Sequence, residues 1–434
     1  MLLIYAPNHS NRLNYIASIF SDALGIKHLV NNNKDEFISY TGPRINYSPT
    51  PISDLEIHII PCSLLFEIEI KDQHIECFNW NKTIAFFKTE NAFGFDVFAA
   101  AFYLISRYEE YLPHQLDMYG RFAHENAVAF KNDFLHKPVV NIWINELKAQ
   151  LTGLFPAIRF IPQPFKFIPT YDIDIAWSYL HKGVIRNAGG LIKSIFSGEF
   201  MDAKERIAVL INKKNDPFDI YEWLDKLHEK FNLSPIYFFL LSGQNKGYDK
   251  NINPGNKFFQ QLIKQQSGKY AVGIHPSWQS GNDPKELQKE IELIKNITGK
   301  QIKKSRQHYI RMKLPGTYRH LIKCGISEDY SMGYGSINGF RASYCLPFKW
   351  FDVELNQATE LNIFPFCFME ANSLFEQHYS AAQAIDELKE YFNEVRKVNG
   401  MFITIFHNHL ITEQPQQVEW RNMYKEFIEK FISA

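Results

Sequence analysis

The 434-residue sequence predicts a mixed α/β protein with two domains. The chain is longer than the roughly 250 to 300 residues over which one hydrophobic core usually grows. Two prolines interrupt the segment Phe160–Phe165, and beyond it short apolar runs alternate with amphipathic helical patterns. We therefore expect an N-terminal domain of unknown role over residues 1–160 and a larger domain over residues 165–434.

The first 160 residues combine strand-like and helical patterns. Apolar runs over Leu55–Ile60 and Leu64–Ile70 predict strands, and apolar residues at helical spacing predict helices over Asp96–Leu112 and Asn141–Leu154. Asp96 is a suitable N-cap for the first of these helices. Together these patterns predict a smaller α+β N-terminal domain.

The remainder of the chain shows seven short apolar runs separated by helical patterns, which is typical of βα units around a parallel sheet or barrel. The expected strands are Phe167–Tyr171, Ile236–Leu241, Tyr270–Ile274, Gln307–Arg311, Gly325–Ile326, Ile363–Phe368 and Met401–Phe406. Asp283 and Pro284 begin one of the intervening helices and Gly299 ends it. Further helices are expected over Ser380–Asn399 and Trp420–Ile432.

Composition excludes several classes of partner. Lys plus Arg and Asp plus Glu both total 47, so the molecule as a whole has no electrostatic attraction toward nucleic acid. The N-terminus lacks the basic and apolar regions of a signal peptide, and no stretch approaches the length of a membrane helix, so we expect a cytoplasmic protein without membrane insertion. The five widely spaced cysteines contain no C-x-x-C pair and predict reduced thiols.

Ionisable residues follow three of the predicted strands directly. Asp172 and Asp174 come after the strand that ends at Tyr171, and His275 and His407 each follow another apolar run. An isolated D-x-D pair is most often a turn, and a single histidine is most often structural. Since the C-terminal ends of parallel strands meet at one face, their joint occurrence favours a shared site.

Three segments resemble motifs of the polysaccharide deacetylases, the NodB-homology group of metal-dependent carbohydrate esterases. Ile168–Asp174 resembles the first motif in the variant with one residue between the aspartates, Gly273–Trp278 resembles the second, and Thr404–His407 resembles the last. The resemblance implies a distorted (β/α)7 barrel over residues 165–434. It further implies that Asp172 is the catalytic base, that Asp174 and His275 bind the metal, and that His407 protonates the leaving amine.

The sequence departs from the family pattern at two positions. Gln279 stands where the second motif has a further histidine ligand, and Arg306-Gln307-His308-Tyr309 resembles the third motif, Arg-x-Pro-Tyr, with His308 in place of proline. We hypothesise that His308 replaces the missing ligand and that Arg306 orients Asp172, as the resemblance implies. Alternatively, His308 packs in the barrel wall and the metal is held with Gln279 or water, or no metal binds.

Substrate-binding candidates come from two segments. Trp278 follows the second motif, while Tyr334 and Arg341 lie in the glycine-rich stretch Met332–Ala342, which is typical of a loop at the barrel mouth. Arg341 is expected either to clamp an anionic substrate group or to form a structural salt bridge. In the N-terminal domain, residues 102–113 and 120–122 look similar to an uncharacterised Bacteroidetes-type domain that precedes such barrels, which implies no activity.

The resemblance implies a hydrolase that removes an N-acetyl or O-acetyl group from a sugar or polysaccharide. Its cofactor is expected to be a divalent metal, with Zn²⁺ first and Co²⁺, Ni²⁺ or Fe²⁺ as alternatives. A second hypothesis is a degenerate barrel that only binds carbohydrate through Trp278 and Tyr334. A third is a glycoside hydrolase that pairs Asp172 with Glu370. The particular sugar and the oligomeric state are left open.

Overall fold

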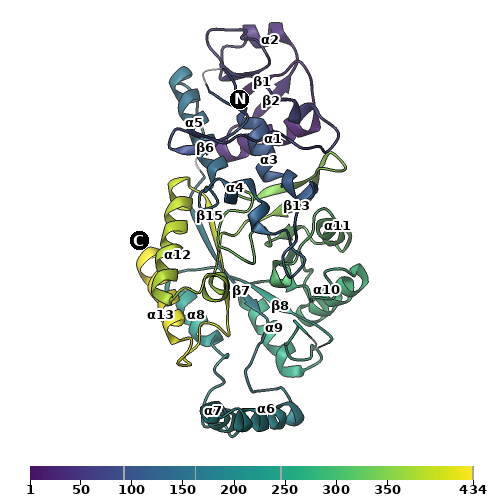
Figure 1. The fold of residues 1–434 in the computed structure, drawn as a ribbon, viewed down its shortest axis with the longest axis vertical. Helices are drawn as coiled ribbons and strands as arrows, with labels where there is room; N and C mark the ends of the chain where they lie inside the picture. Colours follow the sequence, from purple (N-terminus) through teal and green to yellow (C-terminus); the bar gives the residue numbers. More distant parts are fainter. Residues whose placement is uncertain (91–92, 162, 245–246, 433–434) are drawn as a thin grey trace.

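The computed structural model describes residues 1–90, 93–161, 163–244 and 247–432. The molecule is elongated, with the N-terminal region at one end and the helices α6 and α7 at the other. A large sheet lies between them, with α12 and α13 on one side and α10 and α11 on the other (Figure 1). The predicted boundary segment Phe160–Phe165 includes Pro162, which lies outside the described residues.

The N-terminal region contains a four-stranded sheet in the order β2-β1-β3-β4, counted over the described residues, and every pair in it is parallel. A two-stranded antiparallel ribbon, β5-β6, lies beside it. The strands are β1 (Leu2–Tyr5), β2 (His28–Asn31), β3 (Arg44–Tyr47), β4 (Ile57–Ile59), β5 (Phe78–Trp80) and β6 (Thr83–Ala85). The α+β prediction was therefore wrong for the main sheet, because its short strands β1 and β3 and the crossover helix between β1 and β2 escaped recognition.

The helices of this region are α1 (Asn11–Leu24), α2 (Lys34–Ser39), α3 (Val97–Ile105), α4 (Val128–Lys131) and α5 (Val139–Leu154). Asp96 caps α3 by accepting the Ala99 N–H at 2.9 Å, as predicted. This helix ends at Ile105, before a left-handed Arg107 and the 3₁₀ turn Tyr108–Tyr111. The predicted strand Leu64–Ile70 is wrong, since residues 63–66 form a 3₁₀ turn.

The larger sheet has nine strands within the described residues, in the order β12-β13-β11-β10-β9-β8-β7-β15-β14. All pairs are parallel except the edge pair β12 and β13. The bounds are β7 (Lys166–Ile173), β8 (Ile236–Leu240), β9 (Ala271–His275), β10 (Lys304–Ser305), β11 (Glu328–Asp329), β12 (Phe348–Asp352), β13 (Gln357–Ile363), β14 (Phe368–Met369) and β15 (Met401–His407).

The expected (β/α)7 barrel is not observed, because no pairing between described residues joins β12 to β14 and the sheet stays open. The antiparallel β12–β13 hairpin ends the sheet on one side. On the other side, β14 has only two residues.

Four of the seven predicted strands match β7, β8, β9 and β15. The other three were misplaced by a few residues, because β10, β11 and β14 are two-residue strands with almost no local signal. Residues 308–310, inside the predicted strand Gln307–Arg311, form a 3₁₀ turn in which Tyr309 and Ile310 have φ of 58° and 53°. Left-handed backbone of this kind cannot continue a strand.

The helices of this region are α6 (Val184–Phe196), α7 (Phe200–Leu210), α8 (Tyr221–Lys230), α9 (Lys257–Lys269), α10 (Pro284–Thr298), α11 (Gly316–Lys323), α12 (Ala381–Lys397) and α13 (Val418–Phe427). The predicted limits of α10 are confirmed: Asp283 accepts the Lys285 N–H at 2.9 Å, and Gly299 follows in the left-handed conformation. Ser380 caps α12 in a capping box with Gln383. No helix in the described ranges is both long and apolar enough to cross a membrane.

The two regions share one apolar core. Side chains from both belong to the same cluster of buried residues, and the rings of Phe102 and Phe351 meet edge to face with centroids 5.2 Å apart. Arg341 of the C-terminal region pairs with Glu110 of the N-terminal region, with Nη2 and Oε2 2.6 Å apart. The division into two domains stays a prediction. The apolar contact and the ion pair link the two regions.

Candidate active site

Five ionisable side chains from neighbouring strands converge at the C-terminal edge of the large sheet. Asp172 and Asp174 come from the end of β7, His275 is the last residue of β9, and His407 is the last residue of β15. His308 follows β10. These five line a cavity of about 290 Å³. Parallel pairing aligns the strand ends, as the register of His407 opposite Asp172 shows.

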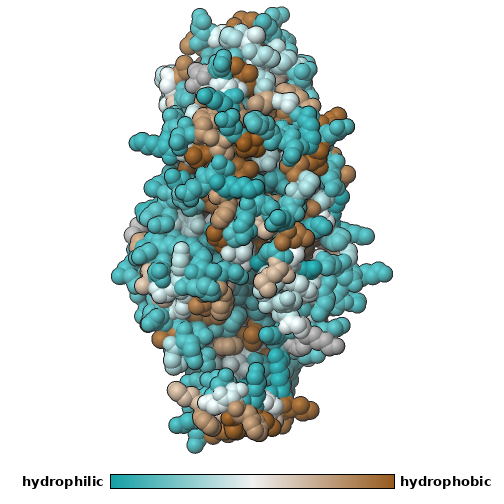
Figure 2. Space-filling model, in the orientation of Figure 1, coloured by the Kyte–Doolittle hydropathy of each residue, from teal (hydrophilic) through white to brown (hydrophobic). Residues whose placement is uncertain are grey.

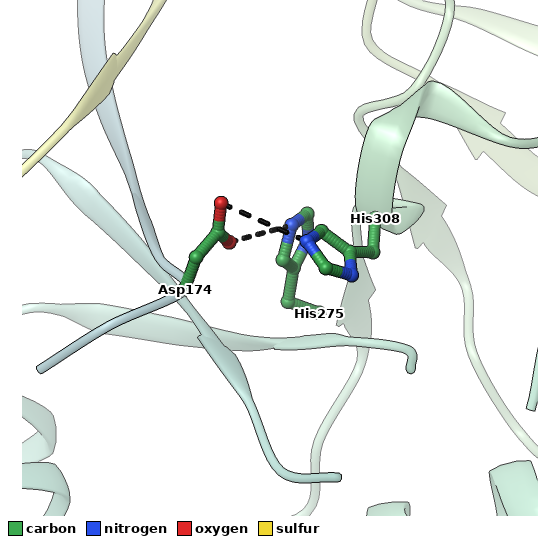
Figure 3. Close-up of side chains that lie close together, drawn as sticks. All are labelled: Asp174, His275 and His308. Carbon is green, nitrogen blue, oxygen red and sulfur yellow. Dashed lines mark ion pairs between the residues drawn. The ribbon is translucent and has the colours of Figure 1, made fainter. Parts of the chain in front are cut away.

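Asp174, His275 and His308 form the tightest part of this cluster (Figure 3). His275 Nε2 lies 3.2 Å from Asp174 Oδ1, and His308 Nε2 lies 3.7 Å from Asp174 Oδ2. Their potential ligand atoms all lie within 4.8 Å of one another. In the part of the chain that the structure describes, no group makes a well-aligned hydrogen bond to the buried Asp174 Oδ1. The three side chains therefore suit a shared cation.

Hydrogen bonds on the opposite side of each ring set the direction of both imidazoles. His275 Nδ1 donates to the Arg306 carbonyl at 2.6 Å, and His308 Nδ1 donates to the Asp249 carboxylate at 3.0 Å. Because both acceptors lack a proton, each neutral ring carries its lone pair on Nε2, facing Asp174. A carboxylate between two such nitrogens needs a positive charge, and either a proton or a metal ion supplies it.

The pKa shifts in this cluster have the same origin. Burial by itself would raise the pKa of Asp174, but His308 and His275 outweigh burial and hold it well below its usual range. Burial would lower the pKa of His308, but Asp174 and Asp249 raise it to about 9. Asp174 thus stays ionised at neutral pH, and either a proton on His308 or a metal ion balances its charge.

Asp172 lies beside this cluster and is held by Arg306. Arg306 Nη1 donates to Asp172 Oδ1 at 2.9 Å and to the Thr170 hydroxyl at 2.7 Å. Asp172 is 2% exposed and Arg306 is fully buried, with its guanidinium 4.4 Å from the Phe238 ring centroid. A charge-assisted bond in such a setting fixes one carboxylate oxygen, while Oδ2 lies 3.8 Å from His275 Nε2.

His407 is held by Glu370. Its ring Nδ1 donates to Glu370 Oε1 at 3.0 Å, and its backbone N–H donates to the same oxygen. Burial would lower the pKa of His407, but Glu370 raises it to about 10. His407 Nε2 faces the cavity, 3.7 Å from Asp174 Oδ2. Glu370 is fully buried behind the ring, which contradicts its pairing with Asp172 as a glycosidase carboxylate.

A strained turn delivers His308. Tyr309 and Ile310 both have positive φ, which is unfavourable for any residue with a Cβ and most unfavourable for a β-branched one. Arg121 from the N-terminal region donates to the Tyr309 carbonyl at 2.7 Å and so supports the turn. Gln279, the alternative ligand, does not belong to the lining of the cavity as far as the chain is described.

Two of the three predicted substrate contacts lie away from the cavity. Arg341 is 1% exposed and pairs with Glu110, and Tyr334 is 2% exposed and accepts a hydrogen bond from Arg107 at 3.3 Å. The anion-clamp interpretation of Arg341 is therefore wrong, because its charge is already neutralised inside the protein. Tyr334 as a sugar contact is also wrong, because its ring is enclosed by the protein.

Trp278, the third predicted contact, belongs to an aromatic group at the rim of the cavity. Its ring stacks on Tyr248 with centroids 4.1 Å apart, and Tyr119 and Tyr309 lie 5.3 Å apart beside them. Tyr119 and Tyr309 line the cavity itself, and Tyr248 is 40% exposed. Tyr119 comes from the N-terminal region, so this region contributes to the site.

Sequence reasoning missed three further residues of the site: Asp249, Tyr119 and His409. Asp249 is fully buried and accepts the Trp278 N–H at 3.1 Å besides its bond to His308. His409 lines the cavity, and burial lowers its pKa to about 4. Asp249 and Tyr119 lie in irregular loops without periodic patterns. Only for His409 was a signal present, in its spacing from His407.

Comparison with known proteins supplies little beyond this geometry. Residues 2–156 match the model of a family of unknown function, DUF7033, and no curated protein matches. The match names no activity, and the Bacteroidetes-type resemblance of this region stays a prediction.

Two of the solved structures similar to this chain are described as polysaccharide deacetylases. A protein from Mycobacterium smegmatis, assigned as a polysaccharide deacetylase, aligns with a TM-score of 0.38 and 13% identity over 63% of this chain and 88% of its own. The polysaccharide deacetylase Bc1974 from Bacillus cereus aligns with a TM-score of 0.32 and 12% identity over 61% of this chain and 88% of its own.

Proposed function

We propose that this chain is a metal-dependent hydrolase that removes the acetyl group from the nitrogen of an N-acetylated sugar. One observation carries the proposal: a supported carboxylate, a carboxylate–histidine cation site and a protonated histidine all face the same cavity. Hydrolysis of an amide needs a base, a means of stabilising the developing oxyanion, and an acid for the leaving group. An O-acetyl ester would use the same groups and is the second substrate type.

The cation site fits a divalent metal. Asp174, His275 and His308 would hold it, since one carboxylate and two neutral imidazoles are a usual zinc ligand set with positions left open. Zn²⁺ is the first candidate, and Co²⁺, Ni²⁺ or Fe²⁺ suit the same donors. When bound, such an ion lowers the pKa of water and polarises a carbonyl oxygen.

Asp172 suits the role of general base. Its Oδ1 is held by Arg306 at 2.9 Å, so the carboxylate has one defined orientation toward the cavity. The neighbouring guanidinium leaves Oδ2 free of this bond, and a carboxylate oxygen of this kind can accept the proton of an attacking water. Arg306 is a positioning residue, because it acts through Asp172.

His407 suits the role of general acid. Burial lowers the pKa of His407, but the Glu370 carboxylate outweighs burial and raises this pKa to about 10, so the ring is protonated at neutral pH. Its Nδ1–H is occupied by Glu370, which leaves the Nε2–H to be donated to the departing amine. An amine leaves only once its nitrogen is protonated, so this donation allows the bond between the carbonyl carbon and the nitrogen to break.

The aromatic group at the rim supports a carbohydrate substrate. Tyr119 and Tyr309 line the cavity, with Trp278 and Tyr248 packed beside them. The apolar faces of sugar rings pack on aromatic side chains, and hydroxyl groups at the ring edge bind polar tips such as those of tyrosine. A sugar held there would place a substituent in the cavity of about 290 Å³.

Acetate release from N-acetylated glucosamine oligosaccharides, with added Zn²⁺ or Co²⁺, tests the activity. We expect Asp172→Asn to lower the rate by about 10²- to 10⁴-fold while the zinc stoichiometry stays unchanged. Absence of acetate release from every N-acetylated or O-acetylated glycan offered would contradict the enzyme assignment. If such a protein still bound glycans, it would be a carbohydrate-binding protein.

Metal content tests the ligand set separately. We expect His308→Ala to weaken Zn²⁺ binding by at least about 100-fold, since it removes one of three protein ligands. His409→Ala is the matched control, because His409 lines the same cavity without belonging to the cluster. Unchanged stoichiometry and affinity in His308→Ala would show that the third ligand is a different group.

A further inference from the structure

The connection between β7 and α8 contains a helical hairpin, α6 and α7, which projects from the end of the molecule farthest from the N-terminal sheet (Figure 1). Its base is firmly held. Asp216 is 3% exposed and accepts the backbone N–H groups of Ser178, Tyr179 and Leu180 at 2.8 to 2.9 Å. These bonds join the segment that precedes the hairpin to the segment that follows it, so the hairpin is an anchored projection.

Helix α6 is amphipathic with its polar side turned inward. Its buried residues are Asn187 and Ser194, whereas Ile185 is 91% exposed and Phe196 is 87% exposed. The Asn187 side chain donates to the Tyr179 carbonyl at 2.9 Å, which fixes the polar side toward the protein. A surface helix of a globular protein normally has the opposite arrangement. The apolar side of α6 is therefore directed at something outside the described chain.

The exposed apolar side chains of the hairpin form one patch, which we call the hairpin patch. Among the described residues it comprises Val184, Ile185, Ile192, Ile195, Phe196, Phe200, Met201, Ile207, Leu210 and Ile211, each at least 42% exposed. The space-filling view shows hydrophobic surface gathered at this end of the molecule (Figure 2). Apolar patches of this kind on a soluble protein mark sites of interaction with a partner or a lipid surface.

The charges around the hairpin patch indicate that a lipid surface, and not a protein partner, binds there. Residues 184–214 contain six Lys and Arg against three Asp and Glu, although the whole chain has a net charge of zero. Lys193 of α6 and Lys204 of α7 are exposed beside the apolar side chains, while Arg186 donates to the Lys250 and Asn251 carbonyls at 3.1 and 3.4 Å. Apolar side chains flanked by basic ones are typical of helices that lie in the interface of an anionic membrane.

We propose that the hairpin patch docks this protein onto the surface of an anionic lipid bilayer. The helices have 13 and 11 residues, too short to cross a bilayer, so they lie in the interface with the apolar side chains among the lipids. The exposed Lys193 and Lys204 face the headgroups. Since the connection that carries the hairpin begins at Asp174, docking also orients the candidate site relative to the membrane. The proposal is independent of the catalytic one.

Co-flotation of the full-length protein with lipid vesicles tests this. One set of vesicles contains phosphatidylcholine alone, and the other contains phosphatidylcholine mixed with phosphatidylglycerol. We expect the protein to float with the anionic vesicles, and the variant Ile185→Ser/Phe196→Ser/Phe200→Ser to bind them at least about tenfold more weakly. These side chains are largely exposed, so the variant keeps its fold, which circular dichroism verifies.

The matched control replaces three exposed apolar residues elsewhere, Leu55→Ser/Ile68→Ser/Leu355→Ser, and we expect it to float like the unaltered protein. We expect Lys193→Glu/Lys204→Glu to abolish the preference for anionic vesicles. Failure of the unaltered protein to float with either composition would overturn the proposal.

Light scattering distinguishes a protein partner from the membrane. Self-association that the triple serine variant abolishes, without vesicle binding, would assign the patch to a contact between copies and would also overturn the membrane proposal. Neither readout depends on acetate release, so both stand whatever the catalytic assay gives.

Discussion

Two buried charge clusters in this protein differ in what balances their charges. In the interface network, defined by Arg107, Arg341, Glu109 and Glu110, Arg107 lies 2.8 Å from Glu109 and 2.7 Å from Glu110, and Arg341 Nη2 lies 2.6 Å from Glu110. In the metal cluster of Asp174, His275 and His308, two imidazole nitrogens and a carboxylate face one another across an open cavity. The first cluster is balanced by side chains alone, whereas in the second either a proton on an imidazole or a metal ion balances Asp174.

The same protein thus uses buried charge for two purposes, stability and ligand binding. Removing one partner of a balanced buried pair leaves an uncompensated charge, which is strongly destabilising. In the metal cluster, hydrogen bonds to Asp249 and to the Arg306 carbonyl instead turn both imidazole Nε2 atoms toward Asp174, where a metal ion can replace a proton. We therefore expect substitutions in the interface network to affect folding, and substitutions around the metal cluster to affect binding.

The largest expected effect is on folding. Arg341→Met removes one cation from Glu110, and we expect it to lower the free energy of unfolding by about 3 to 5 kcal/mol, as measured by urea denaturation. Lys349→Met is the control, since its pair with Glu360 is exposed and should contribute less than about 1 kcal/mol. Equal effects of the two substitutions would show that the interface network is not a stabilising contact.

The next effect is a loss of stability in acid. Burial would raise the pKa of Glu110, but Arg341 and Arg107 lower it from 4.5 to about 2. The unfolded chain therefore binds a proton before the folded one does, so this contribution is present above pH 4.5 and is lost as the pH falls toward 2. We expect the loss to reach about 3 kcal/mol.

Denaturant midpoints measured from neutral pH down to pH 2 test this prediction. Glu110→Gln is the comparison protein, because it cannot titrate at this position. We expect it to be less stable at neutral pH and to show a shallower decline in acid. Parallel pH profiles for the two proteins would contradict the assignment of the acid response to Glu110.

The smallest expected effect concerns the support of the metal cluster. Asp249→Asn weakens the bond that orients His308, and we expect it to lower Zn²⁺ affinity by about tenfold while the stoichiometry and the unfolding free energy stay nearly unchanged. Competition with a chelator measures the affinity. Asp283→Asn is the control, since Asn caps a helix as well as Asp and lies outside the cavity. A normal affinity in Asp249→Asn would remove Asp249 from the site.

Most of the candidate site could be located by sequence pattern because its residues follow strands with strong local signals. β7, β9 and β15 are strands of five to eight residues that are rich in apolar side chains, and their ends deliver Asp172, Asp174, His275 and His407. His308 was reached only as a hypothesis, and the structure brings it to 3.7 Å from Asp174. Its role as a metal ligand stays a proposal.

Local sequence patterns could not predict that the large sheet stays open, nor which residues form the rim of the cavity. Two-residue strands such as β10 and β14 carry almost no periodicity, so neither their limits nor the open edge could be inferred. Tyr119 reaches the cavity from a segment about 190 residues before Tyr309, and a local pattern cannot encode a contact across that separation.

Local sequence patterns were therefore sufficient to predict the alternation of strands and helices and the chemical groups at the ends of three strands. These features depend on the spacing of apolar residues over a few turns or strand residues. Three features depend on tertiary contacts: Arg341 pairs with Glu110, Asp249 supports His308, and the apolar side of α6 is exposed. The physical reason is that pairing and burial depend on which distant segments meet, and composition alone does not specify this.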